Sequence, residues 1–219
     1  MEWTNDQELM ALIRAELFTA VIGDILDNHG YTNQFLPPEV QPLAPEMLLV
    51  GRAMPVLEAN VFDSKDPYGL LFAALDDLKR GEIYVASGAS ARYAMWGELM
   101  STAARARGAT GALLNGYVRD TKGILQMEFP VFCVGRFAQD QKGRGRVIDY
   151  RVAVEIGGVR IQPGDMLVGD IDGAVVVPQQ VEAEIFSEAL DKARAEKVIK
   201  LELEQGMLAT DAFKKYGIL

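Results

Sequence analysis

Two short segments of this chain carry the residues best suited to chemistry, WGELM at residues 96–100 and NGYVRD at residues 115–120. They supply two carboxylates, Glu98 and Asp120, and one guanidinium, Arg119. A guanidinium can hold a planar carboxylate through two parallel hydrogen bonds. Ligand sets made only of oxygen favour Mg²⁺ or Mn²⁺ over zinc. The residue types therefore predict a site for a divalent cation and a small anionic ligand.

The elements around these segments predict that the two segments meet. Residues 82–87 (EIYVAS) have the character of a strand, residues 97–107 form an alanine-rich helix that Gly108 closes, and residues 110–114 form the next strand. In a right-handed strand–helix–strand unit, the start of the helix and the end of the second strand lie at one edge of the sheet. Open α/β sheets bind their ligands at this edge. We therefore expect Glu98 to face the Arg-Asp pair there.

The start of the expected helix adds a third feature. The first backbone N–H groups of a helix have no partner within it, and they attract a carboxylate or a phosphate. Here they belong to Glu98, Leu99 and Met100. The simpler alternative is that Glu98 only complements the helix dipole and that the Arg-Asp pair is an ordinary surface ion pair. The residues alone leave both interpretations open.

An acidic residue, twenty intervening residues and then Arg-Asp, embedded as WGELM…GATGALLNGYVRD, resembles the signature of the 4-hydroxy-4-methyl-2-oxoglutarate aldolase and RraA-like family. The resemblance runs through most of the chain. It includes DILD at residues 24–27, VGRA at 50–53, FPVF at 129–132, IQPGD at 161–165 and GDIDG at 169–173. Two positions depart from the family pattern, which commonly has aspartate in place of Glu98 and Asp-Gly in place of Asn115-Gly116.

The resemblance implies that the substrate is a small 2-oxo acid. Arg119 would bind the pyruvyl carboxylate or the enolate oxygen, and the backbone at Gly97, Leu99 and Met100 would assist. The implied reaction is cleavage of a C–C bond next to the pyruvyl group with release of pyruvate, by retro-aldol reaction of 4-hydroxy-2-oxo diacids or by decarboxylation of oxaloacetate. The alternative is a non-catalytic RraA-like regulator that binds other proteins. Such relatives tend to lack the aspartate that is present here as Asp120.

The implied cofactor is a divalent cation, Mg²⁺ or Mn²⁺. Asp120 would hold it, and Glu98 would be a second ligand, directly or through water. The last helix, expected over about residues 179–205, would be roughly 40 Å long, which exceeds a compact domain with a radius of gyration of roughly 17 Å. We therefore expect part of it to lie on another subunit. By resemblance, such proteins form homotrimers or homohexamers, and Glu196 of this helix would reach a neighbouring subunit's metal ion.

The order of elements predicts an α/β protein with one domain over residues 1–219. Helical spacing of apolar residues indicates N-terminal helices over about residues 4–30, and short strands with turns fill residues 147–177. This order predicts a mixed sheet or partial barrel layered with helices. The resemblance implies the swivelling β/β/α fold of RraA-like proteins. The basic run at residues 142–146 is expected to be a solvated loop, because a P-loop would end in Lys-Ser/Thr.

The composition limits the classes of partner. The chain has 219 residues and a net charge of −9, and its Lys and Arg residues are scattered, which opposes nucleic-acid binding. The single cysteine, Cys133, lies in an apolar run and is expected to be buried, while the single histidine, His29, stands at a helix end. This count excludes zinc sites of the usual Cys and His composition. No leader or membrane-spanning run is found, so we expect a cytoplasmic protein without a membrane partner.

Overall fold

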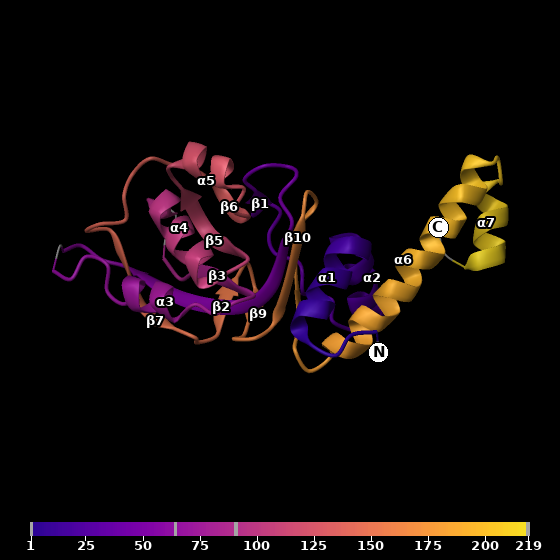
Figure 1. The fold of residues 1–219 in the computed structure, drawn as a ribbon, viewed down its shortest axis with the longest axis horizontal. Coiled ribbons are helices and arrows are strands. Elements are labelled where there is room, and N and C mark those ends of the chain that lie inside the picture. The colour runs from indigo at the N-terminus through magenta and orange to yellow at the C-terminus, as the bar shows by residue number, and fades with distance from the viewer. Residues whose placement is uncertain (1, 64, 90–91, 218–219) are drawn as a thin grey trace.

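The computed structural model describes residues 2–63, 65–89 and 92–217, which form a barrel-like mixed sheet layered with helices (Figure 1). The strands are β1 (Gln41–Pro42), β2 (Leu49–Asn60), β3 (Glu82–Ser87), β4 (Ala94–Trp96), β5 (Gly111–Val118), β6 (Val131–Arg136), β7 (Gly145–Tyr150), β8 (Val154–Ile156), β9 (Val159–Ile161), β10 (Met166–Asp170) and β11 (Gly173–Val177). The helices are α1 (Asp6–Glu16), α2 (Thr19–Asn28), α3 (Leu71–Asp77), α4 (Glu98–Arg107), α5 (Thr121–Met127), α6 (Glu182–Glu204) and α7 (Ala209–Tyr216). The mixed α/β architecture and the long C-terminal helix are confirmed.

The large sheet has the strand order β1-β6-β5-β3-β2-β10-β11, with β4 beside β5 and β7 beside β2. Strands β2, β3, β5 and β6 are parallel, whereas β10 and β11 pair antiparallel. The segment before β2 nearly closes the sheet, because backbone hydrogen bonds join residues 34–36 to β11, and β1 pairs with β6. Strands β3 and β5 therefore lie centrally, and their carboxyl ends open at one edge.

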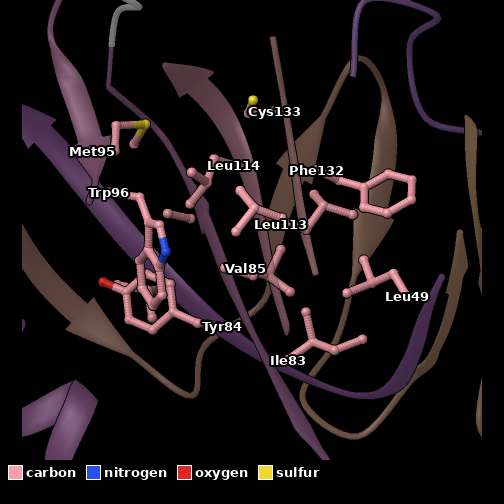
Figure 2. Packing of buried hydrophobic residues seen from close by; sticks show 14 of the residues in the cluster. Leu49, Ile83, Tyr84, Val85, Met95, Trp96, Leu113, Leu114, Phe132 and Cys133 are labelled. Atoms are coloured by element: carbon pink, nitrogen blue, oxygen red, sulfur yellow. The ribbon is translucent and has the colours of Figure 1, made fainter. Parts of the chain in front are cut away.

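The core is divided between the two faces of the sheet. On β11, Ala174 and Val176 belong to the inner cluster, which includes Leu113 and Phe132 (Figure 2). Val175 on the same strand packs with α1, α2 and α6 on the outer face. This alternation follows from the two-residue period of a strand. The helices α1, α2 and α6 thus cover one side of the sheet, while α4 and α5 lie on the other (Figure 1).

The C-terminal helix begins against the sheet and then leaves it. Near its start, Glu182 pairs with Arg52 of β2, which also pairs with Asp6 of α1. The far half of α6 projects away from the sheet, and α7 folds back along it (Figure 1). The sequence analysis did not predict α7. The projection leaves apolar side chains such as Val198 and Leu201 half exposed.

The prediction of a solvated loop at residues 142–146 was wrong for its second half. Gly145 and Arg146 begin β7, which pairs with β2. Arg146 forms a 2.8 Å ion pair with Asp63, and its side chain is largely buried. Gly145 leaves room for the Tyr93 ring, which a Cβ at this position would overlap. Gly145, which suggested a loop, therefore stands in a strand at a position where the Tyr93 ring leaves no room for a side chain.

Candidate active site

The two predicted segments lie side by side at the open edge of the sheet. The backbone N–H of Arg119 donates a 3.0 Å hydrogen bond to the carbonyl oxygen of Trp96. This bond ties the chain after β5 to the chain before α4. Helix α4 starts at Glu98 and ends at Gly108, which adopts the left-handed conformation with φ of 85°. The geometry expected from the strand–helix–strand order is therefore present.

Asp120 lies directly over the start of α4. Gly97, the residue before this helix, has extended backbone, and a Cβ placed on it would be 2.7 Å from Asp120 Oδ2. Asp120 itself has a φ of 54°, in the left-handed region, and precedes the first residue of α5. Glycine at position 97 is what lets the carboxylate approach the start of the helix.

Glu98 and Asp120 border one open pocket of about 440 Å³, together with Lys122 and Gly123. The Glu98 carboxylate packs so closely on the backbone of Gly123 that a Cβ there would overlap it. Mg²⁺ and Mn²⁺ are usually bound through one or two carboxylates and retain several waters. Two carboxylates beside an open pocket match this donor set, so the residues present fit a divalent cation.

Arg119 is held between two carboxylates. Its Nε lies 3.7 Å from Asp120 Oδ2, and its Nη2 lies 3.4 Å from Asp140 Oδ1. Both distances exceed the roughly 2.7–2.9 Å of a tight charge-assisted hydrogen bond. The Arg119 side chain is 39% exposed, which leaves it accessible to an incoming carboxylate. Asp140 was not predicted, because it follows β6 in a segment without a periodic pattern.

Arg119 and the start of α4 line a second pocket, of about 240 Å³. Leu99 and Met100 contribute to its wall, and their part in substrate binding stays a prediction. Leu99 is 83% exposed, so its side chain stands at the mouth. Tyr68 and Phe72, on either side of the start of α3, also line it. Neither aromatic residue was predicted from the sequence as part of the site.

Trp96 anchors the start of α4. Its indole Nε1 donates a 2.7 Å hydrogen bond to Ser101 Oγ, and this hydroxyl donates in turn to the carbonyl oxygen of Gly97 at 3.1 Å. The Trp96 ring lies against the ring of Tyr84, with 4.8 Å between their centroids (Figure 2). Because both rings are fully buried, the first turn of α4 rests on a packed layer and is fixed relative to Arg119.

Glu58 is a buried acid that the sequence analysis did not identify. It stands in β2 with 1% exposure, and the Tyr93 hydroxyl donates a 3.4 Å hydrogen bond to its Oε2. Among the described residues, nothing hydrogen-bonds its Oε1 or the Tyr84 hydroxyl. Burial raises the pKa of Glu58 to about 8, so the side chain holds a proton at neutral pH. The sequence feature that could have identified Glu58 is the presence of an acidic residue inside the apolar run of residues 53–59.

Glu196 lies far from Asp120 of its own chain. It stands on α6, across the sheet from α4 and α5 (Figure 1), and its nearest charged partner is Lys192 at 3.8 Å. A role for Glu196 at this site requires a second copy of the chain, as the sequence analysis expected, and that role stays a prediction.

Within the part of the chain that the structure describes, one group of three metal-ligating side chains converges elsewhere: His29 with Glu184 and Glu188. His29 ends α2, as predicted, and its Nε2 lies 3.1 Å from Glu188 Oε2. This contact raises the pKa of His29. Both imidazole nitrogens face carboxylates, which is the arrangement of a protonated histidine in an ion-pair cluster. Cys133 is buried in β6 as expected, and burial raises the pKa of its thiol to about 11.

Comparisons with known proteins agree with this architecture. The sequence profile described as "RraA-like: Aldolase/RraA" matches residues 19–176. The chain belongs to the Aldolase/RraA family. A family relative from Halalkalibacterium halodurans, named as a candidate 4-hydroxy-4-methyl-2-oxoglutarate aldolase, is 29% identical over 195 residues and is aligned over 89% of each chain.

Two solved structures extend the similarity to the whole Aldolase/RraA fold. An uncharacterized protein from Pseudomonas syringae superposes with a TM-score of 0.85 at 29% identity, over 99% of this chain and 97% of that one. RraAS2 from Streptomyces coelicolor, described as an unusual member of the RNase ES inhibitor RraA protein family, gives a TM-score of 0.80 at 26% identity, over 91% of this chain and 100% of that one. None of the described helices combines the length and apolar character that crossing a membrane requires.

Proposed function

We propose that this protein is a divalent-metal-dependent lyase that cleaves a C–C bond next to a pyruvyl group, by retro-aldol reaction of a 4-hydroxy-2-oxo acid or by decarboxylation of oxaloacetate. The observation that carries the proposal is the placement of Arg119 and Asp120 against the start of α4. Arg119 and the start of α4 line one pocket, Glu98 lines the adjoining one, and Asp120 borders both. Names of relatives in the Aldolase/RraA family support the same reaction class.

The residues of this chain would bind and polarise the 2-oxo acid. The Arg119 guanidinium would grip the pyruvyl carboxylate through two parallel donors. The first backbone N–H groups of α4, at Leu99 and Met100, would donate to the oxygen on which charge develops as the bond breaks, since such donors stabilise an enolate more than the starting ketone. The buried Trp96–Ser101–Gly97 contacts hold these donors in place.

Asp120 and Glu98 would hold Mg²⁺ or Mn²⁺ at the adjoining pocket, where a bound cation supplies positive charge that stabilises the enolate. Glu196 from a neighbouring subunit would complete the site in a homotrimer or homohexamer. The projecting half of α6 supports this assembly, because its apolar side chains have surface left to cover. The two carboxylates of one chain leave coordination positions for a third acid and for substrate.

The proposal is tested by pyruvate release. Purified protein with Mn²⁺ or Mg²⁺ should release pyruvate from oxaloacetate or from 4-hydroxy-2-oxo acids, measured by coupling to lactate dehydrogenase, and EDTA should abolish the release. Full activity in EDTA would remove the metal ion from the proposal. No pyruvate from the whole panel would remove the lyase.

A second candidate function is a non-catalytic regulator that acts through protein binding. It is favoured by the similarity to a structure described within the RNase ES inhibitor RraA family. The complete Arg119-Asp120 pair supports the lyase instead, since a surface that only binds proteins has no need of a carboxylate at the start of α4. A protein without lyase activity that inhibits a purified endoribonuclease would establish the regulator.

A further inference from the structure

The pocket that contains the expected carboxylate grip extends well beyond it. Gly97, Leu99, Met100 and Arg119 all line the 240 Å³ pocket. The other two pockets beside Asp120 lack this combination, because neither is lined by Leu99 or Met100. A pyruvyl carboxylate bound to Arg119 and α4 therefore places the rest of the substrate inside the same 240 Å³ pocket.

The rest of the pocket's lining is largely apolar. It includes the buried Leu71 and the rings of Tyr68 and Phe72, which meet edge to face with 5.4 Å between centroids and 61° between planes. Phe72 is 60% exposed and Leu99 is 83% exposed. Two apolar side chains left open at the mouth of a pocket present surface that an apolar ligand would cover.

The charges along the pocket oppose a second carboxylate on the ligand. Its described lining includes one cation, Arg119, and two acids, Asp120 and Asp140. The cation is already needed for the pyruvyl carboxylate. Two nearby arginines are turned to backbone carbonyls: Arg136 donates to Leu43, and Arg144 donates to Asp140 and Lys142. A distal carboxylate in this pocket would meet Asp140 and the aromatic rings without a cation to neutralise it.

We infer that the preferred substrate is a 4-hydroxy-2-oxo acid whose fourth carbon carries an apolar group, best an aromatic one, in place of a carboxylate. This inference rests on the proposed lyase function and names its substrate class. For the phenyl compound 4-hydroxy-2-oxo-4-phenylbutanoate, the C3–C4 bond breaks and the hydroxyl proton leaves as benzaldehyde forms. The electron pair stays on C3, which takes up one proton to give pyruvate.

The test compares this phenyl acid with 4-hydroxy-4-methyl-2-oxoglutarate by pyruvate release in the presence of Mn²⁺. We expect kcat/KM to be at least about 10-fold higher for the phenyl acid, because apolar contacts in a pocket commonly discriminate by this amount. Phe72→Ala should lower this ratio by raising KM for the phenyl acid. Phe72→Arg should reverse the ratio, since it adds the missing cation. Phe213→Ala, which removes an exposed phenylalanine on α7, is the matched control and should leave the ratio unchanged.

The outcomes separate the two proposals. Pyruvate release that favours the diacid in the wild-type protein would overturn the inference and leave the lyase standing. A ratio that Phe72→Ala and Phe72→Arg both leave unchanged would overturn it as well, because the aromatic wall would then not contact the substituent. Release from neither compound, nor from oxaloacetate, would overturn the lyase and the inference with it.

Discussion

Glu58→Gln should flatten the pH dependence of stability. Glu58 is 1% exposed, and burial raises its pKa from an ordinary 4.5 to about 8. Between these pH values the folded protein holds a proton that the unfolded chain has released. Stability therefore falls as pH rises, by about 1.4 kcal/mol per pH unit. Over the 3.5 pH units between the two pKa values, the total is about 5 kcal/mol.

Glutamine keeps the shape of the protonated acid and does not titrate. Its amide oxygen can still accept the hydrogen bond from Tyr93, while the two tyrosines nearby stay protonated because burial raises the pKa of both Tyr84 and Tyr93. The stability of Glu58→Gln relative to wild type should thus increase by about 1.4 kcal/mol per pH unit from pH 5 to 8. The free energy that the buried amide gains or loses through its own hydrogen bonds does not depend on pH, so it does not change this slope.

The assay is urea unfolding followed by circular dichroism at half-unit pH steps from 5 to 9. Glu46→Gln is the control, because it makes the same substitution at an exposed glutamate. Stability curves of Glu58→Gln and wild type that run parallel would refute the reasoning, since they would show that Glu58 has the same pKa in the folded and unfolded chains.

Asp120→Ala should weaken Mn²⁺ binding and lower kcat at least about 10²-fold. Arg119→Lys should raise KM and lower kcat with little change in metal affinity, because lysine keeps the positive charge and loses the two parallel donors of the guanidinium. Calorimetric titration with Mn²⁺ distinguishes them, and unchanged binding in Asp120→Ala would mean that the pair is wrongly assigned. Gly97→Ala should displace the Asp120 carboxylate, because its Oδ2 lies 2.7 Å from the new Cβ. We expect kcat to fall roughly 10- to 10²-fold at a nearly unchanged melting temperature. A normal kcat would contradict the close approach of Asp120 to Gly97. Light scattering should give a trimer or larger assembly, and a monomer at micromolar concentration would exclude the intersubunit role of α6.

Local signals in the sequence were sufficient to predict how the backbone runs around Arg119. Gly108 ends α4 in the left-handed conformation that glycine favours. The strand–helix–strand order then brings Arg119 beside Trp96. These features depend on residues close together in the chain, so periodicity and end signals predict them. The bounds of α6, Glu182–Glu204, also lie close to the range expected from its apolar and charged pattern.

The walls of the site could not be predicted in the same way. Tyr68, Phe72 and Asp140 reach the pocket only because segments distant in the sequence, the start of α3 among them, meet at the open edge of the sheet. Arg146 was misassigned because Gly143 and Gly145 suggest a flexible loop, whereas Gly145 is required by the Tyr93 ring packed against the strand. Glu58 breaks the apolar pattern of β2, and its carboxylate is buried against Tyr93, which lies 35 residues later in the chain.

The central claim, that this site stabilises the enolate of a pyruvyl group, is tested most directly by proton exchange into pyruvate itself. Pyruvate incubated in D₂O with the protein and Mg²⁺ should exchange its methyl protons well above the buffer rate, measured as loss of the methyl signal in ¹H NMR. This measurement requires no knowledge of the second product. EDTA, Asp120→Asn and Arg119→Lys should each return the exchange toward the buffer rate. Exchange in the wild-type protein that does not exceed that in buffer would contradict the claim.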